Sequence, residues 1–329
     1  MEIRFLTAED LRKALPMSLA IEAMKQAFMQ FSSGDARVPL RTRIDVPTHH
    51  GVTFFMPALL ESSMDMAVKI VSVFPENVRE NLPTIHAAVV VLNPRTGAPI
   101  ALIEGASLTA IRTGAASGAA TDLLAREDAR HLAIFGSGTQ ARTQVQAVCA
   151  VRDINRIWIY SLDQAGAKLF RDEIKQAHSK LQVVEIAPTP EIAIRDAHII
   201  CTATTSETPV FPGNLIQEGT HINAIGSFSP QMQELDAALL QRAMIVLDSQ
   251  EAVLAESGDL IIPIRAGQLT PDAIYAELGE IVQGAKPGRT ASDQITLFKS
   301  VGLAVQDVVS ASAALRGAQQ ADLGILIDL

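Results

Sequence analysis

His131-Leu-Ala-Ile-Phe-Gly-Ser-Gly-Thr-Gln-Ala-Arg142, followed after a helix-like run by Arg156-Ile-Trp-Ile-Tyr-Ser161, is the stretch that decides the fold. Its apolar run Leu132–Phe135 is typical of a buried strand, and alanine and valine recur at helical spacing from Ala141 onward. A second β-rich run closes the pattern. The stretch therefore predicts a strand, a glycine-rich turn, a helix and a second strand, parallel to the first.

The turn itself has the form G-x-G-x-x-A, with Gly136, Gly138 and Ala141 at the fixed positions. The first glycine permits the tight turn, the second lets the backbone approach a pyrophosphate, and the small alanine lets the helix pack close to the strand. The N–H groups and the positive dipole end of the helix then face the phosphates. We therefore predict that a dinucleotide binds at Gly136, Ser137, Gly138, Thr139 and Gln140.

Ser161 bears on the choice of dinucleotide, because it ends the second strand, where an acidic residue would bond the ribose 2′-hydroxyl of NAD. Serine lacks the negative charge that repels a 2′-phosphate, which favours NADPH. However, Leu162 stands where an arginine would strengthen that preference, and Asp163 follows. The sequence favours NADPH and leaves NADH open.

Composition narrows the class of protein. The chain has 329 residues, 48% of them hydrophobic, which is enough for about two domains. A net charge of −9 without a basic block argues against a nucleic-acid or membrane partner. Cys149 and Cys201 are expected to be reduced thiols. With no apolar leader and no run of eighteen apolar residues, we expect a soluble protein of the cytoplasm.

The first hundred residues precede the dinucleotide domain and are not part of it. Two helices, one capped by Thr7 and one over 18–31, lead into several β-like runs, the last two joined as a hairpin by a turn at 93–97. A helix rich in small residues follows at 107–125. The expected first domain comprises 1–117 and 303–329, and the dinucleotide domain comprises 118–302.

Strands and helices alternate after the glycine turn, which predicts a parallel, doubly wound sheet: an α/β Rossmann domain beside a discontinuous α+β domain. The last long helix is expected over 295–318, and the tail 325–329 as a strand of the first domain.

Lys69 is the most informative charged residue. A period of two places it on one strand face, among apolar neighbours on both sides. A buried lysine needs an anion or a shifted pKa, although a lysine on an edge strand can also reach water. Arg41, Arg43 and Arg112 are either surface charges or further cations for one ligand carboxylate, which arginine binds in bidentate fashion.

Histidine does not point to a metal site. His49, His50, His86 and His221 form no cluster with ligand spacing, so no catalytic metal is expected. Hydrogen-bonding structural roles are favoured over proton donation.

Several motifs together resemble the ornithine cyclodeaminase and mu-crystallin family. They are Lys69-Ile-Val-Ser-Val-Phe-Pro-Glu-Asn77, Leu82-Pro-Thr84, Thr109-Ala-Ile-Arg-Thr-Gly-Ala-Ala-Ser117, the glycine turn, Ile222-Asn-Ala-Ile-Gly226 and Asp293-Gln-Ile-Thr-Leu-Phe-Lys-Ser-Val-Gly302. The resemblance covers nearly the whole chain. It implies a dimer formed through the β layer, and a substrate between the two domains.

The resemblance also implies roles for individual residues. Lys69 and Arg112, with Arg41 or Arg43, would hold the substrate carboxylate, and Lys69 is the candidate for proton relay. The residues implied near the cofactor, besides the glycine turn and Ser161, are Thr113, Gly114, Thr202, Ala203, Thr204, Ser227 and Gly302.

Two departures from the family pattern carry most of the functional information. The resemblance implies an acidic residue two places after Gly226, where this chain has Phe228, and a glutamate where it has Phe54. Two apolar rings disfavour a diamino acid, because its side-chain ammonium would lose water without gaining a partner. They favour a cyclic imino acid, whose ring can pack on Phe54 and Phe228.

We therefore expect an NAD(P)H-dependent ketimine reductase. It would reduce Δ1-pyrroline-2-carboxylate or Δ1-piperideine-2-carboxylate to L-proline or L-pipecolate, as a homodimer. Two alternatives stay open: an ornithine cyclodeaminase or alanine dehydrogenase of the same family, and an NADP-dependent ligand-binding protein without turnover.

Overall fold

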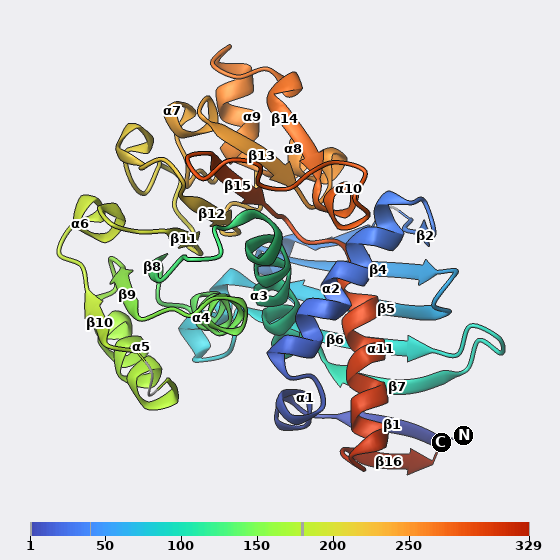
Figure 1. Cartoon of the computed structure of the whole chain (residues 1–329). Coiled ribbons are helices and arrows are strands. Elements are labelled where there is room, and N and C mark those ends of the chain that lie inside the picture. Colours follow the sequence, from blue (N-terminus) through green and yellow to red (C-terminus); the bar gives the residue numbers. More distant parts are fainter. Residues whose placement is uncertain (1, 40, 179–180, 329) are drawn as a thin grey trace. The chain divides into compact units, whose positions relative to one another are not determined.

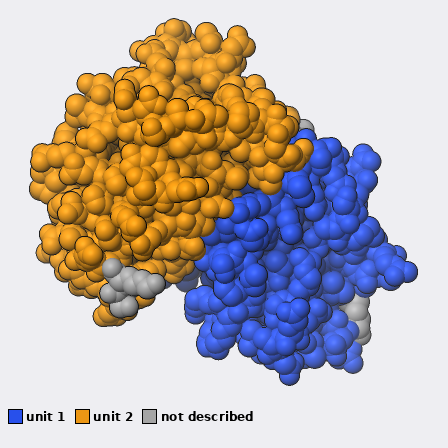
Figure 2. Space-filling model, viewed as in Figure 1, with its two compact units in different colours: residues 1–112, 303–329 blue, residues 113–302 orange. Residues whose placement is uncertain are grey.

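The computed structural model describes residues 2–39, 41–178 and 181–328 and divides the chain into two compact units. Unit 1 comprises 1–112 and 303–329, and unit 2 comprises 113–302 (Figure 2). The domains expected from the sequence were 1–117 with 303–329, and 118–302. In both divisions the first boundary falls within the small-residue helix that follows the hairpin.

Unit 1 is built on a sheet whose described strands follow the order β16-β1-β7-β6-β5-β4-β2, with β3 paired to β4. Neighbours are antiparallel, except β1 and β7. Its strands are β1 (Glu2–Leu6), β2 (Ala36–Arg37), β3 (Thr42–Val46), β4 (Gly51–Leu60), β5 (Asp65–Val73), β6 (Ile85–Leu92), β7 (Pro99–Glu104) and β16 (Ile325–Asp328). The predicted hairpin is confirmed as β6 and β7, and the tail strand as β16.

Helices cover one face of this sheet. α11 (Ala304–Gln320) packs against β4 and β5 and against α2 (Met17–Ser32), and α1 (Ala8–Ala14) packs against α11 (Figure 1). Thr7 begins α1 with a capping box, as its sequence predicts. The sheet residues facing α11 are buried, whereas those on the opposite face are half-buried, so this second face remains apolar and partly open.

Unit 2 contains a wholly parallel sheet in the order β10-β9-β8-β11-β12-β15-β13-β14. The strand order reverses beside β8, as the predicted doubly wound sheet requires. Its strands are β8 (His131–Phe135), β9 (Arg156–Tyr160), β10 (Val183–Ile186), β11 (Ile199–Thr202), β12 (His221–Ala224), β13 (Ala243–Leu247), β14 (Ile274–Glu277) and β15 (Ile295–Lys299).

The elements that connect these strands are α4 (Thr139–Val151), α5 (Gln164–Ala177), α6 (Pro190–Ile194), α7 (Ala237–Leu240), α8 (Gln250–Glu256), α9 (Gly258–Arg265) and α10 (Leu278–Val282), with short 3₁₀ helices at Gly213–Leu215 and Pro271–Ala273. Unit 1 has short 3₁₀ helices at Pro47–His49, between β3 and β4, and at Pro75–Glu80, between β5 and β6.

One element prediction was wrong. The sequence predicted a single helix over 295–318, but residues 295–299 form the strand β15, and α11 begins only at Ala304. Ile295, Leu297 and Phe298 are buried between neighbouring parallel strands, where a continuous apolar run is expected. Such a run does not distinguish strand from helix by periodicity alone.

The small-residue helix α3 (Gly105–Leu124) is confirmed, and it contains the junction between the units. Ala115, Ala116, Ala119 and Ala120 have no exposed surface. A side chain at Gly114 would come within 2.6 Å of the Thr143 carbonyl oxygen in α4. The small residues therefore permit close packing of α3 on α4.

Neither cysteine forms a disulfide. Cys149 and Cys201 are free, and burial raises the pKa of both thiols to about 12, so they stay protonated and unreactive. In the described part of the chain, no helix is both long and apolar enough to cross a membrane.

Candidate active site

The glycine turn has the geometry that its sequence requires. Gly136 has φ +103°, and a Cβ there would lie 2.5 Å from the carbonyl oxygen of Ala203 in the neighbouring loop. Gly138 is the N-cap residue of α4 and has an ordinary φ of −82°. Among the described residues other than its chain neighbours, none has a heavy atom within 4 Å of the position that its Cβ would take. That space, beside the N-terminus of α4, fits the close approach of a pyrophosphate.

Arg142 stabilises the turn through hydrogen bonds to its backbone. Its guanidinium donates to the carbonyl oxygens of Ser137 (2.7 Å) and Gly138 (3.1 Å), and pairs with Glu173 at 2.6 Å. Thr139 and Gln140 form the first turn of α4. The predicted residue Thr113 is buried, and its carbonyl oxygen accepts a weak hydrogen bond from Gln144 of the same helix at 3.4 Å.

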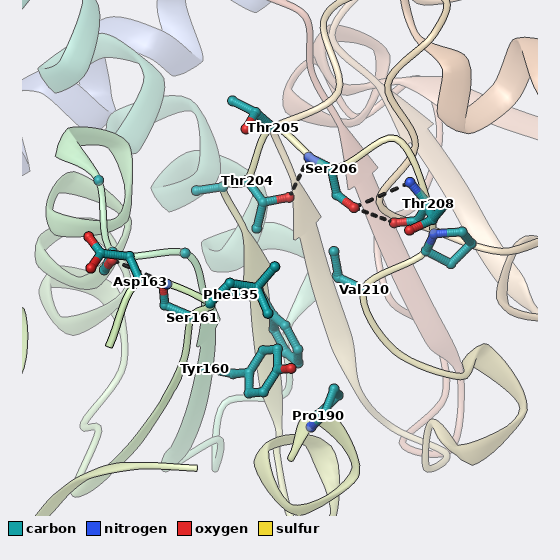
Figure 3. Close-up of a pocket in the computed structure, with 16 residues that line it drawn as sticks. Phe135, Tyr160, Ser161, Asp163, Pro190, Thr204, Thr205, Ser206, Thr208 and Val210 are labelled. Atoms are coloured by element: carbon teal, nitrogen blue, oxygen red, sulfur yellow. Dashed lines mark hydrogen bonds between the residues drawn. The ribbon is translucent and has the colours of Figure 1, made fainter. Parts of the chain in front are cut away.

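A cavity of about 650 Å³ opens beside the turn (Figure 3). Among the described residues that line it, Asp163 is the sole charged one, and none is lysine or arginine. The Ser161 hydroxyl is already engaged, by Ser137 Oγ at 3.0 Å and by the Asp163 N–H at 3.2 Å. Asp163 caps α5 through the Gly166 N–H at 2.9 Å. Leu162, in contrast, is 89% exposed.

The loops after β11 and β12 are joined by a carboxylate that the sequence reasoning missed. Glu234 is fully buried and accepts from the Thr202 hydroxyl (2.7 Å), from the Thr204 N–H and hydroxyl (2.7 and 2.8 Å), and from the Gly226 N–H (2.8 Å). Burial raises its pKa, with a further rise from Asp259. Thr202 is therefore engaged inside the protein, whereas Thr204 lines the cavity with Ala203.

Two other predicted cofactor residues are also held within unit 2. The Ser227 side chain is fully buried and donates to the Met232 carbonyl oxygen at 2.7 Å, so its hydroxyl is occupied. Gly302 adopts φ +87°, and its N–H donates to Asp248 at 2.8 Å. Burial raises the pKa of Asp248, although several donors surround it.

In unit 1, Lys69 and Arg112 lie on either side of one carboxylate. Lys69 Nζ is 2.5 Å from Oδ2 of Asp307, and Arg112 Nε is 3.1 Å from its Oδ1. All three side chains are buried, Lys69 to 3% exposure, so it is not an edge-strand lysine reaching water. Burial lowers the pKa of Lys69 to about 8, against the opposing attraction of Asp307.

The strand register places Phe54 on the face of the sheet that carries Lys69. Met56 pairs with Lys69, and Phe54 lies two residues earlier on β4, opposite Arg43 of β3. The Arg41 and Arg43 guanidinium carbons lie 4.9 and 5.8 Å from the Phe54 ring centroid. Arg43 also pairs with Asp45 at the surface, at 2.7 Å. The positive charge of Arg41 is one of those that lower the Lys69 pKa, and Arg41 is also nearer to the Phe54 ring than Arg43 is.

Phe228 lies in unit 2, in the loop after β12, and 55% of it is exposed. No group of three or more His, Cys, Asp or Glu side chains within 2–39, 41–178 and 181–328 is arranged to hold a metal ion.

The histidines have structural or surface positions. His221 is buried between Thr296 Oγ1 (2.9 Å) and Asn223 Oδ1 (3.2 Å), and burial lowers its pKa to about 3, so it stays neutral. His49, His50 and His86 are exposed.

Comparison with known proteins identifies the family. The sequence profile of the ornithine cyclodeaminase/mu-crystallin family matches residues 1–319. The chain belongs to this family. Its relatives include the Δ1-pyrroline-2-carboxylate reductase of Bacillus cereus, 39% identical over 324 residues, which are 98% of this chain and 99% of that protein. The alanine dehydrogenase of Archaeoglobus fulgidus is 33% identical over 324 residues, 98% of each chain.

Among solved structures of the family, that of Thermococcus litoralis Δ1-pyrroline-2-carboxylate reductase in complex with NADH and L-proline matches with a TM-score of 0.93. The two chains are 43% identical, and the match covers 98% of this chain and 99% of that one. The fold and the family resemblance expected from the sequence are thus confirmed.

Asp307 was missed by the sequence reasoning, although a signal was present. It lies on a buried stripe of α11 with Ala311, Ala314 and Ala318, at helical spacing. A carboxylate on such a stripe requires a buried cation. Without a contact map, nothing assigns that cation to Lys69 or Arg112, which lie more than 190 residues away in sequence.

Proposed function

We propose that this protein reduces Δ1-pyrroline-2-carboxylate to L-proline with a nicotinamide cofactor. The observation that carries the proposal is the buried cation pair of Lys69 and Arg112. Lys69 shares its sheet face with the Phe54 ring, at the position where the family resemblance implied a glutamate. The names of the Bacillus and Thermococcus relatives, at 39% and 43% identity, support the same reaction.

The chemistry asks little of the protein beyond binding and orientation. A protonated cyclic imine is already electrophilic at C2, and the bound nicotinamide supplies the hydride. Lys69 and Arg112, aided by Arg41, would hold the carboxylate and so fix C2 in place, which is catalysis by proximity. The C=N π electrons become the nitrogen lone pair, so no further proton is needed to complete the reduction.

The residue types at two positions favour a ring over a diamino acid. Phe54 in unit 1 and Phe228 in unit 2 are apolar, and neither position supplies a carboxylate for a side-chain ammonium. The five-membered ring is preferred here because the Thermococcus relative was solved with L-proline. The six-membered Δ1-piperideine-2-carboxylate, which gives L-pipecolate, is the second substrate to test.

Two assays test this function. One follows the oxidation of NADH and of NADPH with each imine and with pyruvate plus ammonia, and the other follows the release of ammonia from ornithine. We expect oxidation with the imines and neither alanine formation nor ammonia release. If the imines are not reduced, release of ammonia from ornithine would establish a cyclodeaminase, and turnover of pyruvate plus ammonia would establish an alanine dehydrogenase. Cofactor binding without any oxidation would indicate a ligand-binding protein.

For the cofactor, we propose NADH in preference to NADPH, although Ser161 taken alone favours NADPH. The described lining of the cavity offers no cation to a 2′-phosphate and does include Asp163. The Thermococcus relative was solved with NADH.

A single substitution is expected to move this preference. Leu162→Arg adds a guanidinium at an 89% exposed position on the cavity lining. A hydrogen bond to a charged group contributes about 1.5–3 kcal/mol, so the NADPH/NADH ratio of kcat/KM should rise about 10- to 100-fold. Leu162→Gln, which lacks the charge, is the control. An equal ratio for Leu162→Arg and wild type would contradict this placement.

We further propose a homodimer of a cytoplasmic enzyme. The sheet face of unit 1 opposite α11 carries half-buried apolar residues, among them Phe55, Pro57, Val68, Ile70 and Val90. Light scattering should give twice the chain mass of 35.2 kDa, and Ile70→Asp should yield a monomer. A monomeric wild type, or a variant that remains dimeric, would refute this surface. The free thiols accord with a reducing compartment.

A further inference from the structure

Asp307 holds a position that the proposed reaction does not by itself explain. It is 1% exposed and lies in the first turns of α11, with Lys69 of β5 on one oxygen and Arg112 of α3 on the other. A single carboxylate thus contacts both cations that would bind the substrate, although the three residues come from three separate elements.

The preceding residue reinforces this arrangement. Gln306 Oε1 accepts from Arg112 NH1 at 2.8 Å and from the Leu303 N–H at 3.0 Å. Two consecutive residues of α11 therefore engage one guanidinium, which fixes both its position and its orientation. Gln306 is also fully buried, so water does not compete for these hydrogen bonds.

The charges in this cluster suit a site for an anion. The groups that act on Lys69 are Asp307 from α11, Arg112 from α3, and Arg41 from the segment before β3. Removing the carboxylate would leave buried cations facing one another, which is strongly unfavourable. With the carboxylate present, cations still outnumber it, so a positive charge remains for a ligand carboxylate.

We propose that Asp307 is the positioning residue of this site: it keeps the Lys69 ammonium charged and holds it beside Arg112 for the substrate carboxylate. The inference rests on the proposed function, since it names a further residue for the same reaction. Asp307 acts through Lys69 and Arg112 and is not assigned a contact with the substrate.

The charge state of Lys69 gives this role a distinctive readout. Burial already lowers the Lys69 pKa to about 8, and Asp307 is the chief group that raises it. Without Asp307 the pKa should fall further, by about 1 to 3 units for the loss of one adjacent opposite charge. Lys69 would then be largely neutral at pH 7 to 8.

The experiment compares kcat/KM across pH 5.5–9.5 for wild type, Asp307→Asn, Asp307→Glu and Asp65→Asn. Asp65 begins β5, is buried and pairs with Arg316 of α11 at 3.1 Å, so Asp65→Asn removes another ion pair between the same two elements. It controls for the docking of α11 alone. The imine is Δ1-pyrroline-2-carboxylate, with NADH as the reductant.

For Asp307→Asn, we expect the decline at alkaline pH to begin at least about one pH unit lower, with a loss of about 10- to 100-fold in kcat/KM at pH 8. Asp65→Asn should keep the wild-type profile. Asp307→Glu keeps the charge but moves it, so its profile should match wild type while kcat/KM falls at least about tenfold. Profiles that superimpose for Asp307→Asn and wild type would overturn the proposal.

A direct titration separates this proposal from the proposed function. The ¹³Cε signal of Lys69, assigned by its loss in Lys69→Met, should titrate at lower pH in Asp307→Asn than in wild type. If wild type reduces no imine but this midpoint moves, the proposed function fails and the charge assignment stands. An unmoved midpoint overturns the inference. If Asp307→Asn does not fold, an Asp307→Glu enzyme with unchanged kcat/KM would overturn it.

Discussion

Lys69→Met is expected to lower kcat/KM for Δ1-pyrroline-2-carboxylate by about 10²- to 10³-fold, because truncating a buried, hydrogen-bonded charge partner costs about 2–5 kcal/mol. Methionine keeps the unbranched apolar stem and lacks only the terminal ammonium, so the packing around β5 changes little. Asp307 retains Arg112 as its partner at 3.1 Å. The loss should therefore come from the missing ammonium and appear mainly in imine turnover.

NADH affinity provides the internal control for this variant. The glycine turn and the cavity beside it belong to unit 2, whereas Lys69 belongs to unit 1, so the Kd for NADH should stay close to the wild-type value. Lys13→Met, which removes a 57% exposed lysine of unit 1, should leave both quantities unchanged. Full activity in Lys69→Met would remove Lys69 from the mechanism.

The pH profile offers a second check on the same residue. With a pKa lowered to about 8, Lys69 is charged below pH 8 and becomes neutral above it, so wild-type kcat/KM should fall as pH rises through 8. Arginine stays charged throughout this range. In Lys69→Arg the part of the alkaline decline that Lys69 causes should disappear and only the titration of the imine itself should remain, although the bulkier cation lowers activity at every pH.

Much of the fold follows from local sequence patterns. The Gly136 turn, the β6–β7 hairpin, the small-residue helix α3 and the tail strand β16 were all predictable, because each rests on short-range rules of turn chemistry and periodicity. β15 was not, because a buried parallel strand has no alternating pattern. Its identity depends on its neighbours β12 and β13, which are distant in sequence.

The candidate site residues likewise fall into two groups: those that a local sequence pattern indicates and those that only tertiary contacts reveal. Lys69 was identified from its strand face, and the register confirms that Phe54 lies on that face too. Two buried carboxylates escaped prediction: Asp307, which pairs with Lys69 in unit 1, and Glu234, which joins two loops of unit 2. Their partners are set by tertiary contacts, and an isolated acidic residue in a helix or loop resembles an ordinary surface charge.

The glycine turn permits a prediction in which two neighbouring substitutions separate folding from cofactor binding. Gly136→Ala places a side chain at φ +103°, 2.5 Å from the Ala203 carbonyl oxygen, which is backbone and cannot move aside easily. Backbone strain of this kind costs about 1–3 kcal/mol, so we expect a loss of about 3 kcal/mol in the free energy of unfolding once the clash is included. NADH binding should fall at least about 100-fold, or about 2.7 kcal/mol.

Gly138→Ala should behave differently, although the new methyl group is the same. Its φ of −82° suits alanine, and beyond its chain neighbours the described residues place no heavy atom within 4 Å of the added Cβ, so the free energy of unfolding should change by less than about 0.5 kcal/mol. The methyl group would instead occupy the space in which a pyrophosphate approaches the start of α4, lowering NADH affinity about 10- to 100-fold. Denaturant unfolding and NADH titration of both variants measure the two effects separately. Unchanged NADH affinity in Gly138→Ala would mean that the methyl group meets no phosphate, and therefore that the phosphates do not lie against this turn.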